Sequence, residues 1–302
     1  MKRKLVGQGV TALTVSLPSE WIKKHNLNKG DEVSVNEKGS SLIINSSGSL
    51  SLNRLDLDVS GMDTMVGRLI GAAYKSGYDE IEVKHDNPEE LQKIQKVLGT
   101  TCMGYEIIQQ SKNSAVIKTL TKIDYEEFNT LLRRCFLSLL SIAEETLEAF
   151  RSNDTNSMKS LVLRDMSINR YCDFLRRVLV KKGFEDHSKT APVYYIVEQL
   201  ERIGDLYRDM NKSMAEKNIT PRKELLDLLS RVNSFFRTFY DLYYRFDLKT
   251  MDAFGRERKE LNKEAKDLEV RSDKDEIVML FYINSIFENI FDANGALMMK
   301  NI

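Results

Sequence analysis

The sequence predicts a multidomain α+β protein with a small β-rich N-terminal domain, a small α/β sandwich and a long all-α region. Three observations predict this organisation. Short alternating segments bounded by Gly, Pro and Asn occupy residues 1–49. Strand-like and helix-like segments then alternate over residues 50–122. Residues 123–302 carry long apolar patterns with a period of 3.6 residues, which is typical of helices.

Length and composition limit the class of protein. The 302 residues are enough for two or three domains with their own cores. Lys plus Arg and Asp plus Glu both total 45, so net charge favours neither nucleic acid nor membrane, and any polyanion site must be a local patch. Three widely spaced cysteines speak against a disulfide framework and fit the cytoplasm. No apolar run is long enough to span a bilayer, so we expect no membrane insertion.

The first 49 residues predict two pairs of strands and a short helix. Lys2–Val6 and Thr11–Leu17 are typical of strands, and Val33–Val35 with Ser41–Ile44 is typical of a hairpin. Pro18 favours a helix that starts beside it. So few residues cannot bury much of a core alone, which predicts dimerisation through this domain.

The same residues resemble a known family. The motifs that carry the resemblance are Leu17–Trp21, with the pattern Leu-Pro-x-x-Trp, and Gly30–Val33, with the pattern Gly-Asp-x-Val; Gly7–Gly9 precedes them. In this order and spacing they resemble the AbrB/MazE-type (SpoVT-AbrB) swapped-hairpin DNA-binding domain over nearly all of residues 1–49. The resemblance implies that two chains intertwine as a homodimer and that the first strands and their loop face DNA.

The charges of this domain agree with DNA as a partner. Basic residues open the domain and recur near residue 23, with only Glu20 opposing them before Asp31. Each Lys or Arg that meets a phosphate adds sequence-independent, salt-sensitive affinity, while amide and hydroxyl side chains reach base edges. The alternative is an ordinary solubilising N-terminus. The candidate DNA-binding residues are Lys2, Arg3, Lys4, Gln8, Thr11, Ser16, Lys23 and Lys24.

Residues 50–122 predict a small α/β sandwich with its helices on one face of the sheet. The lone His85 is expected to be exposed and inert. We interpret the region as a coupling or dimerising module rather than as a ligand-binding one. The predicted elements, in chain order, are Leu50–Leu52, Met62–Ser76, Glu80–Lys84, Pro88–Leu98, Tyr105–Gln109 and Ala115–Thr119.

The remaining chain predicts six helices, of which the third, from Pro192 to about Met214, has the most distinctive pattern. Glu201, Asp205 and Asp209 stand four residues apart, so their carboxylates share one face of this helix. Like charges at this spacing destabilise an isolated helix. We therefore expect a cation nearby, either Arg or Lys from a neighbouring helix or a metal ion. The alternative is a solvated acidic edge.

The third and sixth helices repeat one pattern. Leu200-Glu201-x-Ile203-x-Asp205 aligns with Phe287-Glu288-x-Ile290-x-Asp292, so the apolar positions and both carboxylates keep their register. Two helical triples, over residues 123–219 and 220–302, would then end in the same signature. This predicts an internal duplication.

The signature at Leu200–Asp205 and its repeat resemble the PhoU family of phosphate-uptake regulators over about residues 123–302. The order of the three parts resembles the archaeal type of PhoU-family protein. The resemblance implies two tandem three-helix bundles whose E-x-x-x-D carboxylates bind metal. Such ligands suit Mg, Mn, Ca or Fe, a divalent or ferric ion. The implied metal residues are Glu201, Asp205, Glu288 and Asp292, with Asp165 and Asn169 in the place of a further acidic pair.

Three functions follow from these patterns. The first is a phosphate-responsive transcriptional regulator that binds DNA through the N-terminal dimer. The second is an adaptor that docks on a phosphate ABC transporter or a sensor kinase, with residues 1–49 only dimerising. The third is a metal-dependent enzyme. No nucleophilic triad or P-loop accompanies the acids, so we expect no enzymatic activity, and the basic N-terminal residues favour the regulator.

Overall fold

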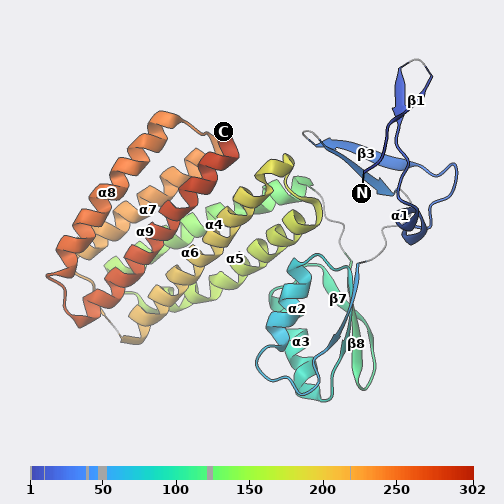
Figure 1. Ribbon diagram of the computed structural model, residues 1–302. Helices are drawn as coiled ribbons and strands as arrows, with labels where there is room; N and C mark the ends of the chain where they lie inside the picture. The colour runs from blue at the N-terminus through green and yellow to red at the C-terminus, as the bar shows by residue number, and fades with distance from the viewer. Residues whose placement is uncertain (1, 10, 39–40, 47–52, 121–124, 218) are drawn as a thin grey trace. The chain divides into compact units, whose positions relative to one another are not determined.

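The chain divides into two compact units, Met1–Asn53 and Arg54–Ile302. Both predicted domain limits, at residues 49/50 and 122/123, fall outside the described residues, so the three-domain division stays a prediction. None of the helices in the described part of the chain combines the length and the apolar character needed to cross a bilayer. The computed structural model (Figure 1) describes residues 2–9, 11–38, 41–46, 53–120, 125–217 and 219–302.

The first unit consists of two antiparallel hairpins and one short helix. Strands β1 (Val6–Gln8) and β2 (Ala12–Thr14) form the first hairpin, and β3 (Val33–Lys38) and β4 (Ser41–Ser46) form the second. Helix α1 (Ser19–Lys24) follows Pro18. The predicted hairpin of Val33–Val35 with Ser41–Ile44 is therefore present, and the two strands predicted before Pro18 pair as well, although the strand limits differ.

The first strand begins at Val6, four residues after the start of the predicted strand Lys2–Val6. Val6 pairs with Thr14 at the open end of the hairpin and Gln8 pairs with Ala12 beside the turn. Because pairing runs outward from this turn over only three residues, the basic residues before Leu5 precede the strand instead of forming it. They are thus left free of the sheet.

No described side chain of Met1–Asn53 is fully buried. Leu13 and Leu42 are each 65% exposed, and Leu5 and Val35 are exposed as well. Covering such side chains is the main favourable contribution to folding and association. This unit therefore leaves much of its apolar surface uncovered by its own residues.

The second unit begins with a four-stranded sheet in the order β5-β6-β8-β7. Strands β5 and β6 are parallel, and the other neighbours are antiparallel. Two helices cover one face of this sheet (Figure 1) and share a core with it. The elements are β5 (Arg54–Asp58), α2 (Val66–Lys75), β6 (Glu80–Lys84), α3 (Pro88–Thr100), β7 (Tyr105–Gln110) and β8 (Ser114–Thr119). The strand predicted at Leu50–Leu52 lies outside the described residues.

His85 corrects a prediction, because it is 2% exposed rather than on the surface. It follows Ile81 and Val83 at alternate positions, and all three point into the core. Its backbone N–H donates to the Asn113 carbonyl at 3.0 Å. The extended backbone thus continues one residue past the end of β6, and the His85 side chain points inward like those of Ile81 and Val83. The alternation of Ile81, Val83 and His85 in the sequence therefore indicates that His85 is buried.

In the described residues from 125 onward, six α-helices surround one continuous hydrophobic core. Helices α4, α5 and α6 contact one another, and helices α7, α8 and α9 contact one another in the same way. Contacts of α6 with α9 and of α4 with α7 join the two sets. Tandem three-helix repeats stay an interpretation of this arrangement. The helices are α4 (Tyr125–Ser152), α5 (Thr155–Lys182), α6 (Thr190–Lys217), α7 (Lys223–Tyr244), α8 (Leu248–Glu269) and α9 (Lys274–Asn301), with a 3₁₀ turn at His187–Lys189.

Acidic side chains start three of these helices. The Asp154 carboxylate accepts from two backbone N–H groups at the start of α5, and Asp247 accepts from the Thr250 N–H at the start of α8. Asp273 and Glu276 form a reciprocal capping box at the start of α9. Each such cap stabilises a helix by about 1 kcal/mol. The sequence thus fixes where the helices turn and hence which faces meet.

Arg177 of α5 joins the bundle to the sheet module. Its side chain is 1% exposed and donates to the Tyr74 carbonyl at 2.6 Å, to the Tyr105 hydroxyl at 3.2 Å and to Asp79 at 3.2 Å. The guanidinium carbon also lies 4.9 and 5.0 Å from the centroids of the Tyr74 and Tyr105 rings. Lys181, one turn further along α5, pairs with Asp79 as well.

Gly77 permits this close approach of the module to α5. Its φ of +87° lies in the left-handed region, and a Cβ at this position would lie 2.6 Å from the Lys181 Cγ. Any other residue would be strained and would push Lys181 away from Asp79. The α/β module and the bundle are therefore built to dock on each other.

Candidate functional site: an arginine–carboxylate network and a nucleic-acid interface

Arg176 collects three carboxylates between α5 and α6. It is buried, and its guanidinium lies 3.1 Å from Asp173 and 2.7 Å from Glu198, and it also pairs with Glu201. Lys75 of α2 adds a fourth contact, 3.3 Å from Asp173. Burial raises the pKa of Glu201 and of Asp173, and the Arg176 charge acts in the opposite direction.

Arg208 collects the next set of acids along α6. Its guanidinium lies 2.8 Å from both Asp165 and Asp209 and also pairs with Asp205. The side-chain amide of Asn169 donates to the same Asp165 oxygen at 2.9 Å. Burial raises the pKa of Asp165, and the hydrogen bond from Arg208 opposes this shift. An arginine is thus the cation in both places. Arg176 comes from the neighbouring helix α5, as expected, whereas Arg208 belongs to α6 itself.

The arrangement bears on the predicted metal ligands. Asp165, Asn169 and Asp205 meet around Arg208, whereas Glu201 is held by Arg176. Within the described residues, no three or more His, Cys, Asp or Glu side chains form a group able to hold a metal ion. As arranged, these residues do not fit a metal centre, because guanidinium groups take the carboxylates. The metal site stays a prediction.

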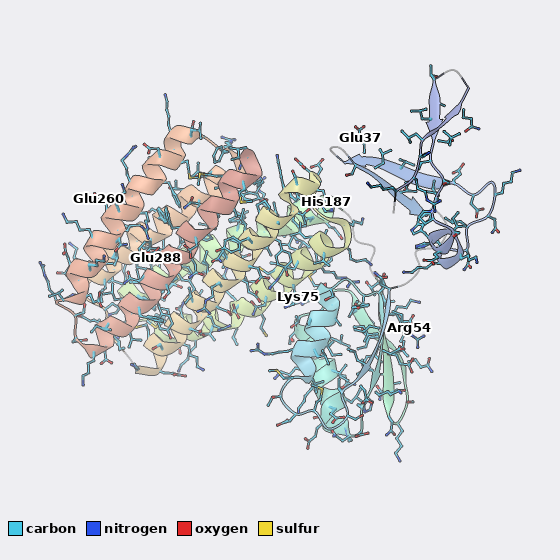
Figure 2. All side chains as sticks on the ribbon, in the orientation of Figure 1. Glu37, Arg54, Lys75, His187, Glu260 and Glu288 are labelled. Carbon is cyan, nitrogen blue, oxygen red and sulfur yellow. The ribbon has the colours of Figure 1, made fainter. Side chains whose placement is uncertain are left out.

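The second copy of the signature is sparser. Glu288 of α9 (Figure 2) pairs with Arg258 of α8 at 3.1 Å, and Arg258 also lies 4.6 Å from the Phe291 ring centroid. Asp292 is exposed. In the first copy Arg208 lies three residues after Asp205, whereas the corresponding position after Asp292 is Gly295. In both copies, an arginine from the middle helix of the triple pairs with the signature glutamate. The second arginine of the first copy has no counterpart.

Gly204 explains the small residue inside the signature. A Cβ there would lie 3.1 Å from the Ile168 side chain, 3.3 Å from Leu139 and 3.5 Å from the Asp165 Oδ1. The glycine lets α6 approach α4 and α5 closely, which brings Asp205 and Arg208 beside Asp165. Leu200 and Ile203 are buried on the same helix. Much of the signature is therefore packing that positions the charges.

The candidate DNA-binding residues all lie exposed in the first unit. Gln8 ends β1 and Thr11 lies in the turn that follows, and Ser16 follows β2. The hydroxyl of Thr14 donates to the Val6 carbonyl at 3.1 Å and closes the other end of this hairpin. Three basic residues lead into the hairpin, whereas Lys23 and Lys24 lie in the last turn of α1. The candidate DNA-binding residues thus lie in two places, in and beside the β1–β2 hairpin and at the end of α1.

Residues 12–49 match the family model of MazE. The family is described as antidote-toxin recognition MazE, a bacterial antitoxin. No significant match was found among curated proteins or among solved structures. The match supports an AbrB/MazE-like domain at the N-terminus of the chain. A MazE-like domain is consistent with a DNA-binding regulator or with an antitoxin-type function.

The buried acids of the network make a pH prediction. Burial raises the pKa of Asp165 above its ordinary value of about 4. At neutral pH the charged carboxylate therefore destabilises the folded state. Protonation in the folded state removes this cost as the pH falls toward the raised pKa. We expect the parent protein to gain stability relative to Asp165→Asn as the pH is lowered from 7 to 4.5. Urea unfolding of both proteins at each pH measures this difference.

Glu145 provides the control with the opposite sign. Hydrogen bonds from Arg164 and Ser141 lower its pKa, so its contribution is lost only as the pH falls below the ordinary value of about 4.3. The difference between the parent and Glu145→Gln should stay flat over the same range. A parent protein that loses stability relative to Asp165→Asn on acidification would contradict the assignment.

Proposed function

We propose that this protein is a phosphate-responsive transcriptional regulator without enzymatic activity. In this proposal, the MazE-like domain binds DNA as a homodimer, and the unit Arg54–Ile302 controls that binding. The observation that carries the proposal is the match over residues 12–49, in a domain whose basic and polar candidate residues are all exposed.

Dimerisation is supported by the apolar surface of the first unit. Leu13 on β2 and Leu42 on β4 stay largely exposed, and none of the described side chains of the unit is buried. Intertwined hairpins from a second copy would cover such side chains, as the resemblance to swapped-hairpin domains implies. The apolar area removed from water would contribute about 25 cal/mol per Å² toward association, before the entropy cost of joining two chains is subtracted.

Control by phosphate is supported by the resemblance of Leu200–Asp205 and its repeat to PhoU-type signatures. The network around Arg176 and Arg208 fits a control role, because each guanidinium serves several carboxylates. Partner binding that removes one carboxylate would therefore redistribute the others. The alternative functions are an adaptor for a phosphate ABC transporter or sensor kinase, and an antitoxin-type protein.

Salt-dependent gel shifts test the DNA-binding part of the proposal. Each phosphate contact contributes a slope of about −0.9 to log K against log salt. Replacing Lys2 and Lys4 by Gln removes up to two such contacts, so the slope should become shallower by about 2 and the affinity should fall. The matched control replaces Lys84 and Lys112, two exposed lysines of the sheet module, and should leave both unchanged.

The alternatives have different outcomes in this assay. A parent protein that binds no DNA even at low salt would contradict the regulator. If that protein is still a dimer by light scattering, the adaptor accounts for it. Equal slopes for the two lysine pairs would place the interface elsewhere on the chain.

A bound divalent or ferric ion is a separate proposal. As arranged, the carboxylates are paired with arginines, and what supports an ion is only that the buried Oδ1 atoms of Asp165 and Asn169 have no hydrogen-bond partner among the described residues. Such an ion would compete with Arg208 for these side chains. Elemental analysis of purified protein tests the assignment. The same metal content in the parent and in a Glu201→Ala/Asp205→Ala variant would refute it.

A further inference from the structure

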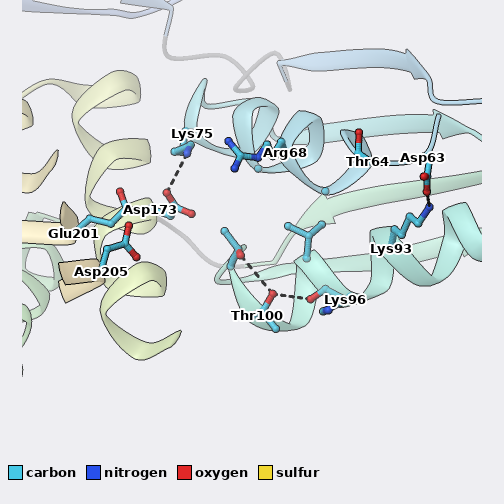
Figure 3. A pocket seen from close by; sticks show the side chains of 14 residues that line it. Asp63, Thr64, Arg68, Lys75, Lys93, Lys96, Thr100, Asp173, Glu201 and Asp205 are labelled. Carbon is cyan, nitrogen blue, oxygen red and sulfur yellow. Dashed lines mark hydrogen bonds and ion pairs between the residues drawn. The ribbon is translucent and has the colours of Figure 1, made fainter. Parts of the chain in front are cut away.

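A cavity of about 790 Å³ lies between α2 and α3 of the sheet module and α5 and α6 of the bundle (Figure 3). All four helices belong to the unit Arg54–Ile302. Small-molecule sites typically have volumes of about 300–1,000 Å³. The cavity therefore has the size of a site for a metabolite rather than for a single ion.

Two glycines on one face of α2 keep this cavity open. Gly67 and Gly71 are one helical turn apart, and both line the cavity. Gly71 is buried, yet a Cβ at this position would meet no atom within 4 Å. Glycine inside a helix costs about 0.5–1 kcal/mol relative to alanine. The helix therefore has an unfavourable residue at a place where a larger side chain would fit the empty space.

The wall formed by the sheet module is basic. Arg68 and Lys75 come from α2, and Lys93 and Lys96 come from α3. Lys75 lies 3.3 Å from Asp173, and Lys93 lies 2.5 Å from Asp63, which is itself 85% exposed. Within the part of the chain that the structure describes, Arg68 and Lys96 have no acidic partner.

The free cations stand close to where the two helices meet. A Cβ on Gly67 would lie 3.8 Å from the Cβ of Val97, so the neighbours of these residues, Arg68 and Lys96, flank one contact between α2 and α3. Thr100, one turn after Lys96, also lines the cavity (Figure 3). The Thr100 hydroxyl donates to the Lys96 carbonyl at 2.8 Å, so the guanidinium of Arg68 and the ammonium of Lys96 are the groups left to bind an anion. Together they suit a phosphoryl group, which offers a dianionic charge and three acceptor oxygens.

The opposite wall is acidic. Asp173 comes from α5, and Glu201 and Asp205 come from α6 (Figure 3). Carboxylates accept hydrogen bonds, so this wall suits the hydroxyl or amino groups of a ligand and repels its anionic end. The two walls therefore select a polar orientation, with the anion toward α2 and α3.

We propose that this cavity binds a small phosphorylated metabolite that carries hydrogen-bond donors, a nucleotide or a sugar phosphate. Its phosphate lies between Arg68 and Lys96, and its donors reach the carboxylates of α5 and α6. Contacts with both walls tie the sheet module to the bundle more tightly. The regulatory meaning of this site rests on the proposed function, whereas its ligand binding is measured without DNA.

Isothermal titration of the full-length protein tests the site. The probes are AMP, ribose 5-phosphate, inorganic phosphate and uncharged adenosine. We expect AMP or ribose 5-phosphate to bind once per chain, inorganic phosphate at least tenfold more weakly because it reaches one wall only, and adenosine not measurably. The absence of binding by both organic phosphates would overturn the proposal, as would equally tight binding of inorganic phosphate.

A cavity-filling variant locates the binding. Gly71→Leu removes no charge and places a side chain in the open space, so it should weaken binding of the organic phosphate at least 100-fold. Gly99→Leu is the matched control, because Gly99 is exposed on α3, does not line the cavity and also faces open space. It should leave the Kd unchanged. An unchanged Kd for Gly71→Leu would exclude the cavity.

A second pair of variants keeps the test independent of any folding defect in Gly71→Leu. Arg68→Gln/Lys96→Gln changes two exposed side chains and should weaken binding at least tenfold, whereas Lys84→Gln/Lys112→Gln should not change it. Equal affinities of the two double variants would contradict the proposed phosphate position. Ligand binding by a protein that fails the gel shift would reject DNA binding and retain this site, and the reverse result would reject the site alone.

Discussion

One buried arginine, Arg177, holds the sheet module against the helical bundle, and the cavity between them depends on it. Its guanidinium reaches a backbone carbonyl, a phenol and Asp79, and it lies beside the rings of Tyr74 and Tyr105. Breaking a buried ion pair on one side typically costs 3–5 kcal/mol, because the other charge is left without a partner. The module therefore cannot slide along α5 without losing several interactions at once, and this fixes α2 and α3 beside α5 and α6.

Helix α5 serves two partners with two neighbouring residues. Successive residues of a helix point about 100° apart, so Arg176 reaches the acids of α6 while Arg177 reaches the module. Asp173 connects the two sides, because it pairs both with Arg176 and with Lys75 of α2. A change in the ion pair between Glu201 and Arg176 would therefore alter the contacts of Asp173 and Lys75, which line the cavity. In the proposed function, this continuity would link the acids of α6 to the cavity within the unit Arg54–Ile302.

Local patterns predicted the elements better than their partners. The predicted strand Glu80–Lys84 matches β6. The limits of α5 are set in the same local way, by the Asp154 cap and by Gly183. The spacing of Glu201 and Asp205 predicted a nearby cation, either an Arg or Lys of a neighbouring helix or a metal ion. That the cation beside Glu201 is Arg176 depends on how α5 packs on α6. His85 is buried, against the prediction, because it continues the alternation of Ile81 and Val83 toward the core. The sequence does not predict the cavity, because the space beside Gly67 and Gly71 becomes enclosed only when α5 and α6 lie against that face of α2.

If Arg177 makes the module and the bundle one rigid body, the distance between two spin labels, one on each part, has a narrow distribution. Labels at the exposed positions Gln92 of α3 and Leu163 of α5 report on the two parts, and the native cysteines are buried. We expect one narrow distribution in the otherwise native protein. It should broaden in Arg177→Met and stay narrow in Arg170→Met, which changes an exposed arginine of the same helix. A broad distribution with Arg177 present, or an unchanged width in its absence, would contradict the account.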